Sequence, residues 1–273
     1  MSFYEKLKTI WRENNSLVCV GLDPDISRFP EKLRNEPESI FKFNKAIIDS
    51  TYDLVCAYKP QIAYFAAESA EDQLEKTIKY IQTEYPEIPI ILDAKRGDIG
   101  STAQKYAIEA FERYRADAVT VNPYLGFDSV EPFLSYKERG TILLCRTSNP
   151  GASDFQDLEV DGEPLYKRVA LLASKKWNTN ENCLLVVGAT WPSQMSEIRN
   201  LVGEMPFLVP GVGAQGGDVE AMVKAGKTKD GTGLIISSSR GVLYAGSGED
   251  FGNAARTVVS NLREEINAYR KEV

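Results

Sequence analysis

The chain has 273 residues, of which 43% are hydrophobic and 26% are charged, and its formal net charge is −7. This composition is ordinary for a globular protein, and the negative charge argues against a general binder of nucleic acid or of membrane surfaces. The chain contains no histidine, which excludes Ser-His-Asp triads, Cys-His pairs, HExxH zinc sites and histidine general bases.

The N-terminal segment, MSFYEKLKTIWREN, is charged and amphipathic, so it predicts a helix over 2–14 and no signal peptide. No apolar stretch reaches the length of about 18 residues that a membrane-spanning helix needs. The four cysteines form no CxxC pair and lie in apolar runs, which predicts buried side chains rather than metal ligands. They are Cys19, Cys56, Cys145 and Cys183. These features favour a reduced, cytoplasmic protein.

Eight short apolar runs, rich in Val, Ile and Leu, follow one another along the chain. Runs that are continuous rather than alternating are typical of strands buried on both faces. They cover residues 16–23, 54–60, 88–95, 117–123, 140–148, 183–190, 206–213 and 233–240. Amphipathic segments separate them, which is the pattern of repeated βα units.

Three of these segments carry helix start signals. Ser101, with Gln104 three residues later, predicts a capping box. Pro192 suits the first turn of a helix. Asp218 opens a segment that closes on Gly226.

Eight similar units without a break in composition predict an α/β fold, a single-domain (β/α)₈ TIM barrel over residues 1–273. A doubly wound sheet is the alternative. We expect the helix over 2–14 to plug the barrel floor and a last helix, over about 251–270, to close the ring.

Two connections are too long for simple turns. Residues 149–164, NPGASDFQDLEVDGEP, follow the fifth strand on the face where barrel enzymes carry their chemistry. They predict an active-site lid, with a disordered surface loop as the alternative. Residues 24–39, after the first strand, look irregular.

Charged residues end several of the predicted strands: Asp23, Lys59, Asp93 with Lys95, and Arg240. Asp93 and Lys95 are two apart, so a regular strand would point both side chains the same way. Asp98 follows three residues later, at the start of the next helix. A lysine between two carboxylates stays protonated, which suits a general acid. The alternative is an ion-pair network that serves stability.

The segment PGVGAQGGD, residues 210–218, contains Gly211, Gly213 and Gly216 in the spacing of a dinucleotide fingerprint. Because it follows the seventh strand and no acidic residue ends the next one, a phosphate site fits better. Arg240 would add a planar fork for phosphate oxygens. Turn glycines and a surface arginine are the alternative.

Together these motifs resemble the orotidine 5′-phosphate decarboxylase family, in its longer-chain branch. DAKRGDIGST is similar to the family's D-x-K-x-x-D-I signature. The motifs GLDPD, YKP, SNPGA, PGVGAQGGD and SSSRGVLYA follow in the family's order, over about residues 16–245. The resemblance implies a homodimer that needs no cofactor and converts orotidine 5′-monophosphate to UMP and CO₂ in de novo pyrimidine synthesis. The lack of histidine and of clustered thiols predicts that no metal is needed.

The resemblance also implies a role for each motif residue. Lys95 would protonate the C6 carbanion, and Asp93 would lie beside the departing carboxylate. Lys59 and Asp23 would hold the ribose hydroxyls. Ser148 would bind the amide edge of the pyrimidine.

Further roles concern the phosphate and a second subunit. Asp98, with Ile99 and Thr102, would reach into the neighbouring subunit's active site. Gln215, in the same loop as Gly211 and Gly213, would span the phosphate and the lid. Arg240 would clamp the phosphate.

The sequence departs from the shorter branch of the family at Gly97 and Gly100, where that branch often has His and Pro. The tyrosine that some members place against the phosphate is not identifiable. Two other functions remain open: a related metal-assisted sugar-phosphate decarboxylase, which needs a carboxylate metal pair at the strand ends, and a barrel that binds a phosphate ligand without turnover.

Overall fold

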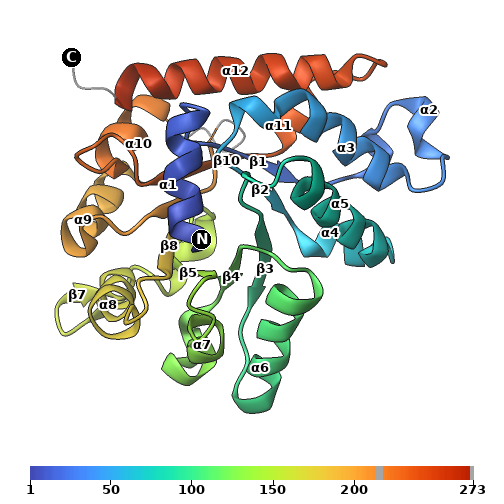
Figure 1. The fold of residues 1–273 in the computed structure, drawn as a ribbon. Helices are drawn as coiled ribbons and strands as arrows, with labels where there is room; N and C mark the ends of the chain where they lie inside the picture. Colours follow the sequence, from blue (N-terminus) through green and yellow to red (C-terminus); the bar gives the residue numbers. More distant parts are fainter. Residues whose placement is uncertain (213–217, 271–273) are drawn as a thin grey trace.

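The computed structural model of the protein describes residues 1–212 and 218–270. Its main sheet has eight parallel strands in the order β2-β1-β10-β9-β8-β5-β4-β3. Isolated bridges from Tyr58 to Ile90 and from Gln61 to Asp93 join β2 to the β3 end, so the sheet curls into a barrel (Figure 1). The expected TIM barrel is confirmed.

Each strand of the main sheet lies in one of the eight apolar runs, and only the third strand extends beyond its run, by one residue to Arg96. They are β1 (Val18–Leu22), β2 (Ala57–Pro60), β3 (Ile91–Arg96), β4 (Ala118–Val121), β5 (Gly140–Arg146), β8 (Cys183–Val187), β9 (Phe207–Val209) and β10 (Leu234–Ser238). A small antiparallel hairpin pairs β6 (Glu159–Val160) with β7 (Glu163–Pro164).

Helices surround the barrel (Figure 1). The α-helices are α1 (Phe3–Glu13), α2 (Glu31–Arg34), α3 (Ser39–Thr51), α4 (Ile62–Ala66), α5 (Glu71–Glu84), α6 (Gly100–Ile108), α7 (Phe127–Leu134), α8 (Leu165–Leu172), α9 (Pro192–Val202), α10 (Val219–Gly226), α11 (Arg240–Leu243) and α12 (Phe251–Arg270). Short 3-10 helices are η1 (Ile26–Arg28), η2 (Tyr52–Leu54), η4 (Pro123–Leu125) and η5 (Pro150–Asp154), and π-helical turns are η3 (Glu109–Arg113) and η6 (Ala173–Trp177).

Two of the three expected helix starts are confirmed. Pro192 begins α9, and the Asp218 side chain caps α10 by accepting a hydrogen bond from Ala221 N at 3.1 Å. The capping box at Ser101 is wrong, because α6 begins at Gly100 with Ile99 as its N-cap, two residues before the expected start. Gly100, with a φ of +54°, makes the turn into that helix without the strain a side chain would bring.

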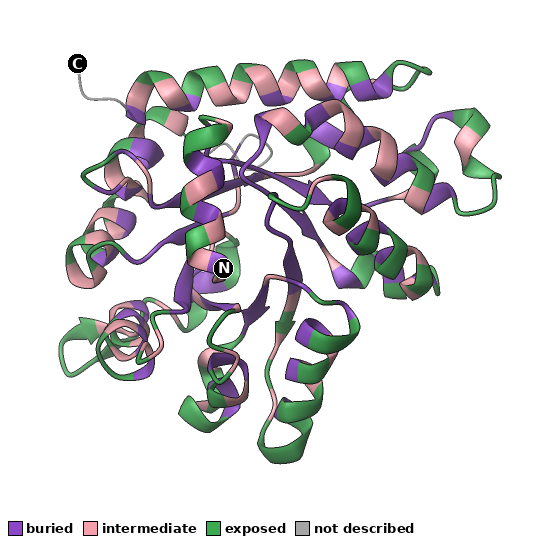
Figure 2. Ribbon diagram, in the orientation of Figure 1, coloured by how far each residue is buried: buried purple, intermediate pink, exposed green. Residues whose placement is uncertain are grey.

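The strands at the centre of the molecule are buried (Figure 2), and the buried apolar side chains form one continuous cluster. Strands β1, β2, β4 and β8 are buried at every position. All four cysteines are buried, as expected, and burial raises the pKa of the Cys19 and Cys183 thiols to about 12. Thiols with such a pKa are unreactive at neutral pH. None of the helices in the described part of the chain is long and apolar enough to cross a membrane.

The α1 helix packs against the first residue of β5, Gly140. A Cβ built on Gly140 would lie 2.4 Å from the Phe3 ring, so only glycine allows this approach. Ser2 and Glu5 form a reciprocal capping box that begins the helix.

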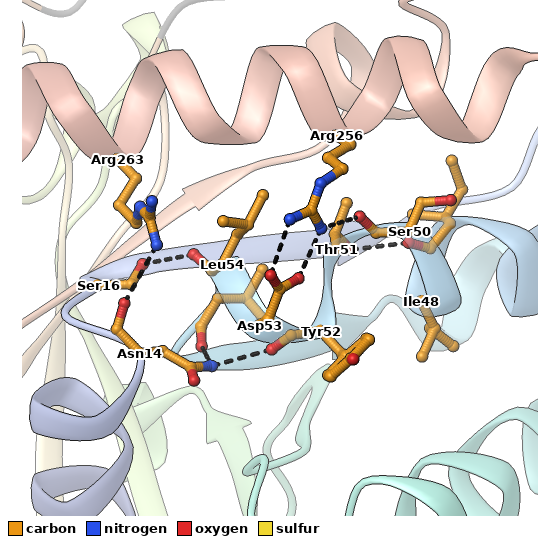
Figure 3. A network of polar contacts seen from close by, with 12 residues as sticks. Asn14, Ser16, Ile48, Ser50, Thr51, Tyr52, Asp53, Leu54, Arg256 and Arg263 are labelled. Carbon is orange, nitrogen blue, oxygen red and sulfur yellow. Dashed lines mark hydrogen bonds and ion pairs between the residues drawn. The ribbon is translucent and has the colours of Figure 1, made fainter.

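The last helix, α12, packs between α3 and α10. Arg256 of α12 forms a double ion pair with Asp53 at 2.6 and 2.8 Å and donates to Ser50 O, and Arg263 donates to Asn14 O (Figure 3). These contacts join the end of the chain to the segments that precede β1 and β2, so α12 closes the ring of helices.

Candidate active site

A cavity of about 410 Å³ opens at the carboxyl ends of the strands. Its polar wall comes from β2, β3 and β4, its apolar wall from β5, β8 and β9, and its rim from the segment after β5. The polar wall includes Lys59, Asp93, Lys95 and Thr120, the apolar wall includes Leu144, Val186, Leu208 and Pro210, and the rim includes Ser148, Phe155 and Gln156. A second cavity, of about 600 Å³, lies beside α1 near the amino ends of the strands, and neither Asp93 nor the two lysines line it.

Three charged residues meet in the cavity. Lys59 Nζ lies 2.8 Å from Asp93 Oδ2, and Lys95 Nζ lies 2.7 Å from Asp93 Oδ1. Lys59 and Asp93 are only 5% and 7% exposed, whereas the Lys95 side chain is 49% exposed. The buried Asp93 carboxylate therefore forms ion pairs with two ammonium groups. Lys59 is buried in the barrel wall, and Lys95 faces the opening of the cavity.

The charges in this array stabilise one another against burial. Burial disfavours the ionised form of Asp93, but the two lysines outweigh it and lower the pKa of the carboxyl group. Burial likewise disfavours charged Lys59, yet Asp93 and Asp23 outweigh it and raise the pKa of the amine. At neutral pH the array consists of one carboxylate and a buried ammonium that is held charged.

Asp93 and Lys95 share a direction, but not through regular strand alternation as the sequence suggested. The pairing of β3 with β4 slips between Leu92 and Arg96, and Lys95 has a φ of +47°. The slip is a bulge, and bulges re-aim side chains. Thr120 of β4 holds it: its hydroxyl accepts from Ala94 N and Lys95 N and donates to Asp93 Oδ1. Sequence reasoning missed Thr120, whose one signal is a polar residue within an apolar strand.

Asp98 does not join this array within the chain. Its carboxylate accepts a hydrogen bond from the next backbone N–H, of Ile99, at 2.8 Å. Among residues 1–212 and 218–270, Lys95 therefore contacts one carboxylate, that of Asp93, and not the two expected. Ile99 and Thr102 are exposed near the start of α6.

Asp23 follows β1 and is partly buried near Lys59, whose pKa it raises. Its Oδ1 atom is buried and has no hydrogen-bond partner within residues 1–212 and 218–270. Tyr244, which the sequence analysis did not single out, donates to Asp23 O at 3.1 Å and accepts from Asp25 N at 2.7 Å. The loop is thus fixed while one carboxylate oxygen stays available.

Ser148 lies on the cavity rim, just after β5. A Cβ on Gly188 would lie within 2.8 Å of the Ser148 backbone, so that glycine allows the close approach of the two segments. The neighbouring Thr147 is held by Gln156, which accepts from its N–H and donates to its hydroxyl, both at 2.8 Å. Trp191 Nε1 also donates to Thr147 O.

The segment 149–164 docks on a buried cation. Arg146, at the end of β5, is fully buried and pairs with Asp157 at 3.1 Å and with Gln156 Oε1 at 3.3 Å. Its guanidinium also lies over the Trp191 ring at 4.3 Å. Sequence reasoning missed Arg146, since an arginine inside an apolar run gives no sign of its partners.

The candidate phosphate site is only partly described. Gly211 follows β9 with a φ of +98°, and Arg240 is exposed at the start of α11, after the adjacent strand β10. Gly213 and Gln215 lie outside the described residues. Within the described ranges, no group of three or more Cys, Asp or Glu side chains is placed to hold a metal ion.

Comparisons with known proteins agree on one family. Residues 16–255 match the model of the orotidine 5′-phosphate decarboxylase / HUMPS family. The chain is 72% identical to the orotidine 5′-phosphate decarboxylase of Cellvibrio japonicus, covering 99% of this chain and all of that protein, and 61% identical to that of Azoarcus sp. over 99% and 100%. Among solved structures, the OMP decarboxylase of Leishmania donovani has a TM-score of 0.86 at 38% identity, with both chains fully covered.

Proposed function

The chain belongs to the orotidine 5′-phosphate decarboxylase / HUMPS family, and from this premise we propose that it converts orotidine 5′-monophosphate to UMP and CO₂ in pyrimidine biosynthesis. The observation that carries the proposal is the Lys59–Asp93–Lys95 array at the mouth of the barrel. The carboxylate between the two ammonium groups would repel a phosphate, so the array does not suit a site that only binds one.

The array supports decarboxylation through a carbanion. The bond between C6 and the substrate carboxylate breaks, CO₂ leaves, and the electron pair stays on C6. The Lys95 ammonium stabilises this charge and then transfers its proton to C6. Because half of its side chain is exposed, Lys95 can regain a proton from water. Asp93 lies beside the substrate carboxylate, and their repulsion falls as neutral CO₂ forms.

The remaining roles follow from position. Lys59 and the unpartnered oxygen of Asp23 bind the ribose hydroxyls. Ser148 binds the pyrimidine amide. Arg240 and the loop that begins at Gly211 bind the phosphate, with Gly213 and Gln215 assigned by sequence alone.

We further propose a homodimer with shared active sites. Large apolar side chains are exposed beyond the ends of β3 and β4, at Ile99, Tyr124, Leu125 and Phe127. Such a group of exposed apolar residues is typical of an interaction surface. A second copy covering it would receive Asp98, Ile99 and Thr102 into its own site.

The segment 149–164 is proposed as the lid of this site. Phe155 and Gln156 of this segment line the cavity. Asp157 joins the segment to Arg146, and the β6–β7 hairpin follows Asp157 in the chain. Phosphate binding far from C6 can supply the energy that closes such a lid.

The reaction is proposed to need no metal or cofactor. Both oxygens of Asp93 are engaged by ammonium groups, and a divalent cation there would face two positive charges. This arrangement disfavours the metal-assisted alternative. The unpaired cysteines support a cytoplasmic location.

The test is a direct assay of the purified chain with orotidine 5′-monophosphate, following the loss of orotate absorbance and the release of CO₂. Stoichiometric formation of UMP is expected. Binding of the nucleotide without turnover would identify a phosphate-ligand binder instead.

A further inference from the structure

The hydroxyl of Thr120 is surrounded by the segment that carries the charged array. Thr120 is 1% exposed. Its Oγ1 atom accepts from Ala94 N at 3.0 Å and from Lys95 N at 2.9 Å, and donates to Asp93 Oδ1 at 2.9 Å. A hydroxyl has one proton and two lone pairs, so all of its bonding capacity is directed at three consecutive residues of β3.

These three residues form the bulge of β3. Between the paired positions Leu92↔Val119 and Arg96↔Val121, β3 advances four residues while β4 advances two. The extra residues lose regular ladder partners on β4, and their partly buried N–H groups need another acceptor. The Thr120 side chain supplies it for two of them.

The bulge also holds Lys95 in a costly conformation. A non-glycine residue with a φ of +47° is strained, and such strain persists only where the surroundings enforce it. The hydrogen bond from Lys95 N to Thr120 Oγ1 holds the backbone of the strained residue. The hydrogen bond from Thr120 Oγ1 to Asp93 Oδ1 holds the same oxygen that Lys95 Nζ contacts. One side chain thus fixes both ends of the Lys95–Asp93 contact.

We propose that Thr120 is a positioning residue for the decarboxylation: its hydroxyl holds the β3 bulge that places the Lys95 ammonium beside Asp93 and the reacting carbon. This inference rests on the proposed function. Thr120 acts through Lys95 and Asp93, so its loss lowers the rate of the chemical step and leaves the binding of the nucleotide nearly unchanged.

The experiment compares Thr120→Val with Thr120→Ser and with a matched control, Thr141→Val. Thr141 is a fully buried threonine on β5 whose hydroxyl has no hydrogen-bond partner among the residues described. We expect Thr120→Val to lower kcat about 100-fold, as small misplacements of catalytic groups do, with KM changed by less than about threefold. Thr120→Ser, which keeps the hydroxyl, should recover most of kcat, and Thr141→Val should resemble the wild type.

Equal kcat values for Thr120→Val and Thr141→Val would overturn the proposal. So would a loss that Thr120→Ser does not recover, because the hydroxyl would then not be the cause. If Thr120→Val does not fold, Thr120→Ala removes the same hydroxyl without a methyl group against the two N–H groups, and must show the same separation of kcat from KM.

If the wild-type chain fails to decarboxylate the nucleotide, the proposed function is wrong, and crystal structures still decide the geometric claim. We expect the Lys95–Asp93 contact to be lost in Thr120→Val and kept in Thr141→Val. An unchanged bulge in Thr120→Val would contradict it.

Discussion

Lys95 Nζ lies 2.7 Å from Asp93 Oδ1, although Lys95 holds a left-handed backbone conformation that a regular strand would not allow. The other oxygen of Asp93 binds the buried Lys59. The same carboxylate therefore anchors the array within the barrel wall and orients the ammonium group that faces the cavity.

The first prediction concerns this carboxylate and pH. Asp93→Asn should lower the free energy of unfolding at pH 7 by about 3–5 kcal/mol, because it leaves buried Lys59 without its closest partner. The folded-state pKa of Asp93 is lowered, so its stabilisation is present above the unfolded pKa of about 3.9 and is lost as pH falls below it.

Urea unfolding from pH 7 down to about pH 3 measures this effect, and the difference between wild type and variant should shrink below about pH 4. Asp154→Asn is the control, since it removes an exposed carboxylate that forms no ion pair with the described residues. If the difference in unfolding free energy between wild type and Asp93→Asn stays constant with pH, the Lys59–Asp93 ion pair is not its cause.

The second prediction tests the shared site. The Asp98 carboxylate accepts from Ile99 N and does not contact Lys95 of the same chain, and under the proposed homodimer it acts in the partner subunit's site. Lys95→Ala and Asp98→Ala chains should each be inactive. Random co-refolding gives about half heterodimers, each with one wild-type site, so activity should return to roughly a quarter of that of the same number of wild-type sites. If no activity returns despite demonstrated chain exchange, the sites are not shared.

The third prediction concerns the phosphate. Arg240→Ala should weaken binding of UMP by about 10-fold or more and leave uridine binding almost unchanged, because a charge-assisted contact to phosphate is lost. Isothermal titration with both ligands measures this. Arg256→Ala is a control that removes an arginine paired with Asp53, away from the cavity. Equal losses for UMP and uridine would remove Arg240 from the phosphate site.

The fourth prediction concerns metals. Activity should survive exhaustive treatment with EDTA, because lysines occupy both oxygens of the Asp93 carboxylate. Rates before and after dialysis against chelator provide the measurement. Inactivation that added Mg²⁺ reverses would favour the metal-assisted sugar-phosphate decarboxylase.

Much of the fold could be predicted because its signals are local. Strands buried on both faces require continuous apolar runs, and β1, β8 and the others show them. The barrel then brings strand ends together, so Lys59 and Asp93 could be expected at one site although 34 residues separate them.

What the sequence could not show depends on register and on loop packing. The β3 bulge arises from its pairing with β4, and nothing in DAKRGD marks the two extra residues that Thr120 holds. Arg146 and Tyr244 act on segments distant in sequence, whose docking is a tertiary property. Lys95 and Asp98 are close in sequence, yet Lys95 pairs with Asp93 while the Asp98 carboxylate accepts from Ile99 N.

The central claim is that this chain decarboxylates orotidine 5′-monophosphate with Lys95 as the acid, and the most direct measurement is kcat for wild type and Lys95→Ala side by side. Lys95 is half exposed, so the variant should keep the wild-type thermal unfolding transition. We expect turnover in the wild type and a loss of at least about 1000-fold in the variant, because both the charge and the proton for C6 are removed. A folded Lys95→Ala chain that retained more than about a tenth of the wild-type kcat would contradict the account.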